Sequence, residues 1–364
     1  MALGAKVSAA RAHQGPQWGV RATTLVYGSE EVSELHDTGD AHPERPLRLT
    51  AFFEGLRECG LGDAIERRPS RVASQGDLLR VHSGAYMDEI RGFIAAGGRV
   101  VDADTIVSEG SWEAAAFAAG AGLSAVEDLR AGVGRSAFVA VRPPGHHASS
   151  AQAMGFCLLN NIAVTAAALT ASGERVLIVD WDVHHGNGTQ DIFWDDPQVL
   201  FVSTHEWPLY PGTGRATETG GASAPGLTLN VPLPSGTTGD VARMVLDEVV
   251  APAVDRFDPT WVLVSCGFDA HRDDPLADLA WSSGDYADLT TAVAQFAPGP
   301  QRLIMFLEGG YSLPAVRDSS IAVLTSLSDT PVRPEPPTAG GPGRDAVRRA
   351  LELQRQSLES HLSE

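Results

Sequence analysis

The amino-acid sequence predicts an α/β protein with a single large domain: a central parallel β-sheet of about eight strands, covered by helices on both faces. Apolar runs of strand length recur along the chain, at 137–141, 176–180, 199–204, 227–231, 261–265 and 303–307. Helical periodicity fills several of the gaps between them, at 112–129, 161–171, 241–257 and 286–295. Strands that are apolar throughout and alternate with helices indicate a parallel sheet that is buried on both faces.

The order of segments along the chain indicates one domain followed by a short extension. Residues 1–22 are predicted to be an irregular lead-in, and no linker-like break interrupts residues 23–330. Although 364 residues would suffice for two domains, α/β domains often run past about 250 residues as one unit. Residues 331–344 are rich in Pro and Gly and predict a linker. Residues 345–364 then predict a terminal helix that docks on the domain or on a neighbouring chain.

Composition excludes several classes of protein. The chain has 27 Lys and Arg against 46 Asp and Glu, a formal net charge of −19, so direct binding to nucleic acid is not expected. No run of 18 apolar residues is present, and we expect no membrane span. Cys59, Cys157 and Cys266 lie far apart, which argues against a disulfide framework. Because the N-terminus also lacks the apolar core of a signal peptide, a cytoplasmic location is expected.

The first strand with a polar end runs into Arg142-Pro-Pro-Gly-His-His147. Ligands of open parallel sheets bind beyond the carboxyl ends of the strands, so His146 and His147 are candidate site residues. Paired imidazoles suit general acid–base chemistry because their ordinary pKa lies near neutrality. The alternative interpretation is a pair of surface histidines in a loop.

The next such strand, 176–180, continues into alternating Asp180, Asp182 and His184. Side chains at i, i+2 and i+4 of extended backbone share one face, so Asp182 and His184 can reach one ion with Asp180 behind them. Carboxylate and imidazole ligands suit Zn²⁺, and Fe²⁺, Mn²⁺ and Co²⁺ stay open. A cluster satisfied only by hydrogen bonds is the alternative.

Two later strands deliver further candidates. The strand at 261–265 is followed by Asp269, a candidate third ligand, and three protein ligands plus a water form an open, catalytic zinc site. The strand at 303–307 leads through two glycines to Tyr311, whose phenol could donate to a developing oxyanion. Taken singly, Asp269 could be a turn or N-cap residue and Tyr311 a packed loop residue.

Together these motifs resemble the histone deacetylase family, which has the arginase–deacetylase fold. The matching stretches occur in family order: His42-Pro-Glu-Arg-Pro46, Arg142-Pro-Pro-Gly-His-His147, Gly155-Phe-Cys-Leu-Leu-Asn-Asn161, Asp180-Trp-Asp-Val-His-His-Gly-Asn-Gly188, Tyr210-Pro-Gly-Thr-Gly214, Gly267-Phe-Asp-Ala-His271 and Leu307-Glu-Gly-Gly-Tyr311. The pattern is closer to class II and bacterial deacetylases than to class I, because Asn187 stands where class I has Asp and because Glu308 precedes Gly-Gly-Tyr.

The resemblance implies a role for each matching residue. Asp182, His184 and Asp269 match the ligands of one catalytic Zn²⁺. The implied catalytic residues are His147 as general base and acid, His146 as its electrostatic partner, Asp180 behind His146, Asn187 oriented toward His147, and Tyr311 as oxyanion donor. The implied substrate residues are Gly155, Phe156 and Tyr210 in the acyl-lysine tunnel, Leu276 at its gate and Asp104 at its rim, with Asp102 as a competitor for that rim position.

Three further sites follow from the resemblance alone. Arg45 matches a residue near the inner end of the channel, where acetate leaves. Structural K⁺ is implied at Asp180, Asp182, His184, Ser203 and Thr204, and a second K⁺ at Phe193, Asp196 and Val199.

The implied function is a zinc-dependent amidohydrolase that removes acetyl or other acyl groups from lysine side chains of proteins or peptides. The alternative is a small-molecule deacetylase, such as an acetylpolyamine amidohydrolase, which carries an acidic residue where Leu276 stands. A binuclear Mn²⁺ ureohydrolase is disfavoured because Gly186 and His271 replace aspartates that it needs. A non-catalytic module is disfavoured because the chain retains every implied ligand and Tyr311. The oligomeric state stays open, a homo-oligomer included.

Overall fold

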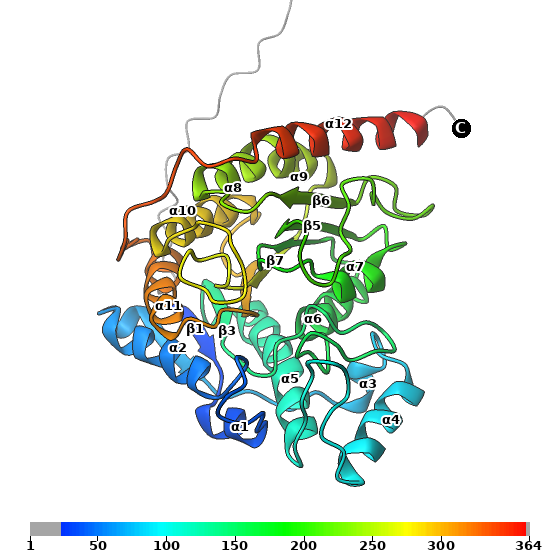
Figure 1. Cartoon of the computed structure of the whole chain (residues 1–364), viewed down its shortest axis with the longest axis vertical. Coiled ribbons are helices and arrows are strands. Elements are labelled where there is room, and N and C mark those ends of the chain that lie inside the picture. The colour runs from blue at the N-terminus through cyan, green and yellow to red at the C-terminus, as the bar shows by residue number, and fades with distance from the viewer. Residues whose placement is uncertain (1–22, 362–364) are drawn as a thin grey trace, which may run out of the picture.

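The computed structural model describes residues 23–361 (Figure 1). The predicted lead-in, 1–22, and the last three residues of the predicted terminal helix lie outside this range. Within it, eight strands form one sheet in the order β2-β1-β3-β8-β7-β4-β5-β6, and every neighbouring pair is parallel. The predicted fold class, an α/β protein with one parallel sheet, is confirmed.

The strands and helices have these bounds. The strands are β1 Thr24–Tyr27, β2 Ile65–Arg68, β3 Ser136–Val139, β4 Val176–Asp180, β5 Val199–Glu206, β6 Thr228–Leu233, β7 Trp261–Cys266 and β8 Leu303–Leu307. The first helices are α1 Glu30–Leu35, α2 Leu47–Glu58, α3 Gln75–Leu78, α4 Gly84–Ala95, α5 Ser111–Arg130, α6 Asn161–Thr170 and α7 Asn187–Phe193. The later ones are α8 Gly239–Val245, α9 Ala251–Phe257, α10 Ser283–Val293, α11 Leu313–Leu327 and α12 Arg344–His361, and short helical turns occur at η1 Gly62–Ala64, η2 Leu246–Val250 and η3 Ala294–Phe296.

Two strands and one helix break differ from the expected pattern. Strands β1 and β2 were not predicted, because β1 is only four residues long and β2 reads Ile-Glu-Arg-Arg, a polar sequence that suits its place at the sheet edge. The segment predicted as one helix at 241–257 contains a π-helical turn, η2, between α8 and α9. Pro252 explains this turn, since it lacks an N–H and crowds the preceding turn of a helix.

The sheet separates two apolar clusters, one on each face. One cluster contains side chains of α2, α8, α10 and α11, and the other contains side chains of α4, α5 and α6. Alternation along β4 illustrates the division, because Leu177 and Val179 enter the first cluster while Val176 and Ile178 enter the second. The central strands β4, β7 and β8 are therefore apolar until their carboxyl ends, where polar residues begin.

The C-terminal extension packs on the domain. Residues 331–343 contain neither helix nor strand, but their backbone contacts α10, as when Thr338 N–H donates to Asp285. Helix α12 then packs against β6, the edge strand, and buries Val347 and Ala350 (Figure 1). Such a helix covers the last strand of the sheet. None of the helices among residues 23–361 has the length and apolar character needed to cross a membrane.

The alanine-rich helix α5 packs closely because glycines face its neighbours. A Cβ added at Gly122 would lie 2.1 Å from Oγ1 of Thr165 on α6 and 2.7 Å from the Phe306 ring on β8. A Cβ added at Gly92 in α4 would meet nothing within 4 Å. Gly122 and Gly92 are therefore a matched pair of helical glycines, one tightly packed and one facing open space.

We expect Gly122→Ala to lower the free energy of unfolding by roughly 1–3 kcal/mol, since the added methyl overpacks the contact with α6 and β8. Gly92→Ala should raise it by up to about 1 kcal/mol, because alanine restricts the unfolded chain and favours helix. Urea unfolding followed by circular dichroism measures both changes. Equal effects of the two substitutions would contradict the packing derived for α5.

Candidate active site

Four strand ends meet at one place because β3, β8, β7 and β4 are consecutive in the sheet. All are parallel, so their carboxyl ends lie on the same edge. The segments 308–311, 267–274 and 181–187 follow β8, β7 and β4 directly, and 142–147 follows β3 after two residues. The structure thus brings together the histidines, aspartates and tyrosine that the sequence motifs singled out separately.

Asp182, His184 and Asp269 are buried and offer three ligand atoms that all lie within 4.8 Å of one another. His184 Nδ1 is 3.2 Å from Asp182 Oδ1 and 3.2 Å from Asp269 Oδ2. The other carboxylate oxygens are held by backbone: Gly309 N–H donates to Asp182 Oδ2 at 2.7 Å, and Val183 N–H donates to Asp269 Oδ1 at 2.9 Å. Each aspartate therefore keeps one oxygen turned toward the imidazole.

This group fits a divalent cation. Although burial disfavours imidazolium, hydrogen bonds and charges of Asp182 and Asp269 raise the pKa of His184 to about 10. A proton is thus held between two buried carboxylates, where a cation would neutralise them more fully. Two carboxylate oxygens and one imidazole nitrogen are a donor set that suits Zn²⁺. Glycines make the room: a Cβ at Gly267 would lie 2.1 Å from Asp182 Oδ2, and one at Gly309 would lie 1.9 Å from Asp269 Oδ2.

The adjacent histidines have opposite protonation. His146 Nδ1 lies 3.0 Å from Asp180 Oδ2, and although burial opposes it, the charges of Asp182 and Asp180 raise the pKa of His146 to about 10. His147 Nδ1 lies 2.8 Å from Asn187 Oδ1, a neutral partner. Burial and the charges of His146 and His184 hold the pKa of His147 well below its ordinary value. His146 is therefore a cation and His147 a neutral imidazole at neutral pH.

A cavity of about 210 Å³ leads to these groups, and its lining comprises Asp104, His147, Gly155, Phe156, His184, Leu209, Tyr210, Leu276 and Tyr311. The Phe156 ring stands edge-on to Tyr311 at 5.8 Å between centroids, and the Tyr210 ring stands edge-on to His147 at 5.2 Å. Gly155 has φ +56°, and a Cβ there would lie 2.4 Å from His147. Tyr210 is 36% exposed and Leu276 37% exposed, so both reach the mouth.

At the rim, Asp104 lines the cavity and Asp102 does not. His42 and Thr105 hold the Asp104 loop: His42 Nε2 lies 3.1 Å from the Asp104 carbonyl, and Phe156 N–H donates to Thr105 Oγ1 at 3.1 Å.

Leu209, beside Tyr210, was not among the predicted site residues. Its apolar side chain carries no chemical signal, and only the fold brings it to the cavity.

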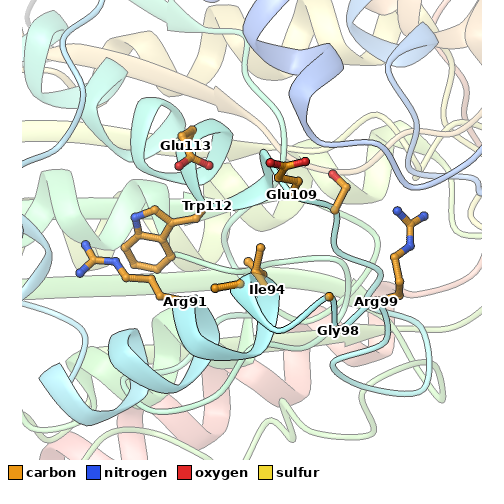
Figure 2. A pocket seen from close by; sticks show the side chains of 10 residues that line it. Arg91, Ile94, Gly98, Arg99, Glu109, Trp112 and Glu113 are labelled. Atoms are coloured by element: carbon orange, nitrogen blue, oxygen red, sulfur yellow. The ribbon is translucent and has the colours of Figure 1, made fainter.

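A larger hollow, about 770 Å³, lies on the surface between α4 and α5 (Figure 2). The guanidinium of Arg91 lies 4.2 Å from the centre of the Trp112 ring, and Arg99 stands apart from this pair. This hollow has no histidine or cysteine in its lining, and no group of three close metal ligands among the described residues falls in it. Size alone therefore does not identify the chemical site.

The assignment of Arg45 to the inner end of the channel is corrected by the structure. Arg45 precedes α2, and its Nη1 donates to the Asp40 carbonyl at 2.6 Å at the surface. The buried arginine of this segment is Arg48, on the inner face of α2: its Nε donates to Gly310 O at 2.6 Å, and its Cζ lies 4.9 Å from the centre of the Tyr311 ring. A charged residue on the apolar face that also carries Phe52 was the signal that could have identified it.

Two buried carboxylates near the site were also missed. Glu44 Oε1 accepts from Arg48 at 3.0 Å and Glu44 Oε2 accepts from Arg142 at 2.6 Å. Although burial opposes ionisation, Arg142 and His36 hold the pKa of Glu44 well below its usual range. Glu308 Oε2 accepts from the N–H groups of Gly145 at 2.7 Å and His146 at 3.2 Å. Burial raises the pKa of Glu308 to about 7. Glu308 orients the loop that carries the two histidines.

The residues matched to K⁺ sites fall in two places. Asp180, the last residue of β4, is paired in register with Ser203 within β5, and Thr204 Oγ1 lies 3.5 Å from the Asp180 carbonyl. Phe193 ends α7, Val199 begins β5 and Asp196 lies between them. The Asp196 N–H donates to the Phe193 carbonyl at 3.1 Å, and the Val199 N–H donates to the Asp196 carbonyl at 3.2 Å. Binding of K⁺ to either group stays a prediction.

Comparison with known proteins gives the family. The model of the histone deacetylase domain matches residues 42–327. A protein named probable deacetylase from Archaeoglobus fulgidus is 39% identical over 296 residues, which cover 80% of this chain and 82% of that protein. The histone deacetylase-like amidohydrolase of Pseudomonas aeruginosa is 38% identical over 292 residues, covering 79% and 77%. The crystal structure of the HDA15 HD domain aligns with a TM-score of 0.83 at 35% identity, covering 94% of this chain and 99% of that one. The chain therefore belongs to the histone deacetylase family.

Proposed function

We propose that this chain is a Zn²⁺-dependent amidohydrolase that removes acetyl or other acyl groups from lysine side chains of proteins or peptides. One observation carries the proposal: the ligand atoms of Asp182, His184 and Asp269 converge beside a cavity that also exposes His147 and Tyr311. Relatives named deacetylase and amidohydrolase support hydrolysis of an acyl amide.

Each polar residue of the site has a task in such a reaction. Zn²⁺ held by Asp182, His184 and Asp269 would supply Lewis acidity toward the amide carbonyl and acidify water. The neutral His147, whose Nδ1–H is held by Asn187, has Nε2 free to take the proton of the attacking water. The same nitrogen then returns that proton to the leaving amine. The cationic His146, fixed by Asp180, adds positive charge beside the reacting groups.

Tyr311 supplies the remaining hydrogen bond. Its buried phenol keeps its proton, because burial and the charges of Asp269 and Asp182 raise the pKa of Tyr311 well above its usual value. The neutral phenol can therefore donate to the tetrahedral oxyanion, an interaction worth roughly 3–4 kcal/mol in comparable sites.

The shape of the cavity suits an extended aliphatic chain with an acylated end. Its aromatic walls, Phe156 and Tyr210, exclude water from the stem of an acyl-lysine, and Asp104 at the rim can accept backbone N–H groups of a peptide. We assign K⁺ as a structural ion to the groups around Asp180 and Ser203. We further propose a cytoplasmic location, supported by the three free cysteines.

An acetylated polyamine is the second candidate substrate. The net charge of −19 favours a polycationic ligand, whereas the apolar Leu276 at the mouth offers it no carboxylate.

Turnover of an acetyl-lysine peptide and of acetylspermidine by the same preparation decides between the two substrates. We expect the peptide to have the higher kcat/KM, because the mouth carries Leu276 and the rim carboxylate Asp104 is placed for a peptide backbone. In Leu276→Glu the preference should move toward acetylspermidine, since the new carboxylate faces its amines. A wild-type preference for the polyamine would replace the lysine assignment.

Metal removal tests the proposed cofactor. After chelation and dialysis, we expect the chain to rebind a single Zn²⁺ per molecule and to regain activity only then. Asp182→Asn should lose both Zn²⁺ binding and activity, because the substitution removes a charged ligand. Asp273→Asn, an exposed carboxylate four residues after Asp269, is the matched control and should keep both. For wild type and both variants, the metal content is measured by mass spectrometry and compared with the activity. Full activity of the stripped protein is the outcome that excludes this cofactor.

The pH profile tests the neutral partner of His147. Asn187→Asp places a carboxylate 2.8 Å from His147 Nδ1, which favours imidazolium and raises the pKa of His147. Because the base must be neutral, the acidic limb of kcat/KM should move to higher pH, by roughly 1–3 units. An unchanged limb would show that Asn187 does not set the basicity of His147.

A further inference from the structure

Asp274 is a buried carboxylate to which the reaction above gives no task. It is 7% exposed, and among the described residues no cation forms an ion pair with it. Its partners are backbone N–H groups: Oδ2 accepts from Tyr311 at 2.6 Å and from Ser312 at 3.3 Å, while Oδ1 accepts from Leu276 at 3.1 Å. One carboxylate thus joins the residue that carries the phenol to the residue at the mouth of the cavity.

Tyr311 needs such a fixed partner because its own backbone is permissive. Two glycines precede it, and Gly310 has φ +116°, a conformation that side-chain-bearing residues rarely adopt. Arg48 holds the Gly310 carbonyl on one side of the turn, and Asp274 holds the Tyr311 N–H on the other. The Tyr311 phenol is therefore positioned by a guanidinium group and a carboxyl group that act on its main chain.

The loop that carries Asp274 is anchored in turn by the C-terminal extension. Glu335 Oε2 accepts from His271 Nε2 at 2.7 Å and from Ser283 N–H at 3.1 Å, and Glu335 Oε1 pairs with Arg272. Asp274 N–H donates to the His271 carbonyl at 2.9 Å. A Cβ at Gly284 would lie 2.3 Å from the Glu335 carbonyl, so the extension lies tightly against the start of α10. Glu335 thereby fixes the loop from outside the cavity.

His271, Asp273 and Glu335 also lie close enough to hold a metal ion, and this alternative is weaker. His271 Nδ1 already accepts the Asp273 N–H at 3.2 Å, which leaves the proton on Nε2, facing Glu335. Arg272 brings a positive charge to the same carboxylate. The arrangement is a hydrogen-bond network in which both oxygens of Glu335 and both ring nitrogens of His271 already have partners.

We propose that Asp274 is a positioning residue that sets Tyr311 and Leu276 relative to each other, and that Glu335 anchors its loop to the C-terminal extension. The inference rests on the proposed function, because Tyr311 must donate to the oxyanion for its position to affect the rate.

Asp274→Asn tests the first part. The amide nitrogen would face backbone N–H donors, so at least one of the three hydrogen bonds is lost. We expect kcat on an acetyl-lysine peptide to fall by roughly 10- to 100-fold, the effect of a small displacement of a reacting group, with bound Zn²⁺ unchanged. Asp273→Asn, its exposed neighbour, should leave kcat unchanged.

Repeating Asp274→Asn in a Tyr311→Phe background separates positioning from general damage. If Asp274 acts through the phenol, it has no further effect on kcat once the phenol is gone. The same fold loss in both backgrounds would overturn the assignment.

Hydrogen–deuterium exchange supplies a readout that does not depend on turnover. Asp274→Asn should speed exchange at the amides of Tyr311 and Leu276, whereas Asp273→Asn should not. Glu335→Gln should speed exchange across residues 271–276 and lower kcat in the same direction as Asp274→Asn. Unchanged exchange in these variants contradicts the inference whatever the activity. Absence of turnover in the wild type, with the exchange pattern intact, would instead overturn the proposed function.

Metal content separates the network from a second metal site. Wild type and Glu335→Gln should bind the same amount of Zn²⁺. Loss of an ion in both Glu335→Gln and Asp273→Asn would identify the cluster as a metal site and reject the anchor.

Discussion

Two aspartates with no access to water face each other across one imidazole, and their mutual repulsion is the constraint on which the site depends. Buried carboxylates are stable only when paired or hydrogen-bonded. Backbone N–H groups of Val183 and Gly309 satisfy one oxygen of each aspartate, and the His184 N–H also donates to Asp182 Oδ1. The two oxygens that face the imidazole attract a positive charge between them. The glycines that make room for the carboxylates, the strand ends that carry them and the adjacent histidines all lie around this pair of aspartates.

The same electrostatics differentiates two neighbouring histidines of identical chemistry. His146 faces Asp180 and lies near Asp182, whereas His147 faces an amide and two positively charged rings. Environments that push the pKa values of two titratable groups apart assign the acid and base roles in many enzymes. Here the neutral histidine, His147, is the one that lines the cavity, so the residue proposed as the base lies where a substrate can meet it.

The residues that sequence reasoning identified share a property: they follow apolar strands in a parallel sheet. That rule places Asp182, His184, Asp269 and Tyr311 at one edge without any knowledge of side-chain contacts. It fails for Arg48, which reaches the site from a helix, and resemblance alone selected Arg45, three residues too early. The strands β1 and β2 were missed because one is short and the other polar. Asp274 and Glu335 escaped notice since their partners are backbone groups and residues about 40 to 60 positions away, which only the folded chain brings near.

The packing of α12 on β6 determines where the chain can be truncated without exposing the sheet. The Pro- and Gly-rich stretch before α12 looks in the sequence like a natural place to truncate the chain. Truncation there would remove Val347 and Ala350 from the apolar cluster that also contains Leu229 and Leu233 of β6, and would uncover a strand at the edge of the sheet that can pair with another molecule. A shortened chain should therefore be prone to aggregation, and the compact catalytic unit extends into the last helix.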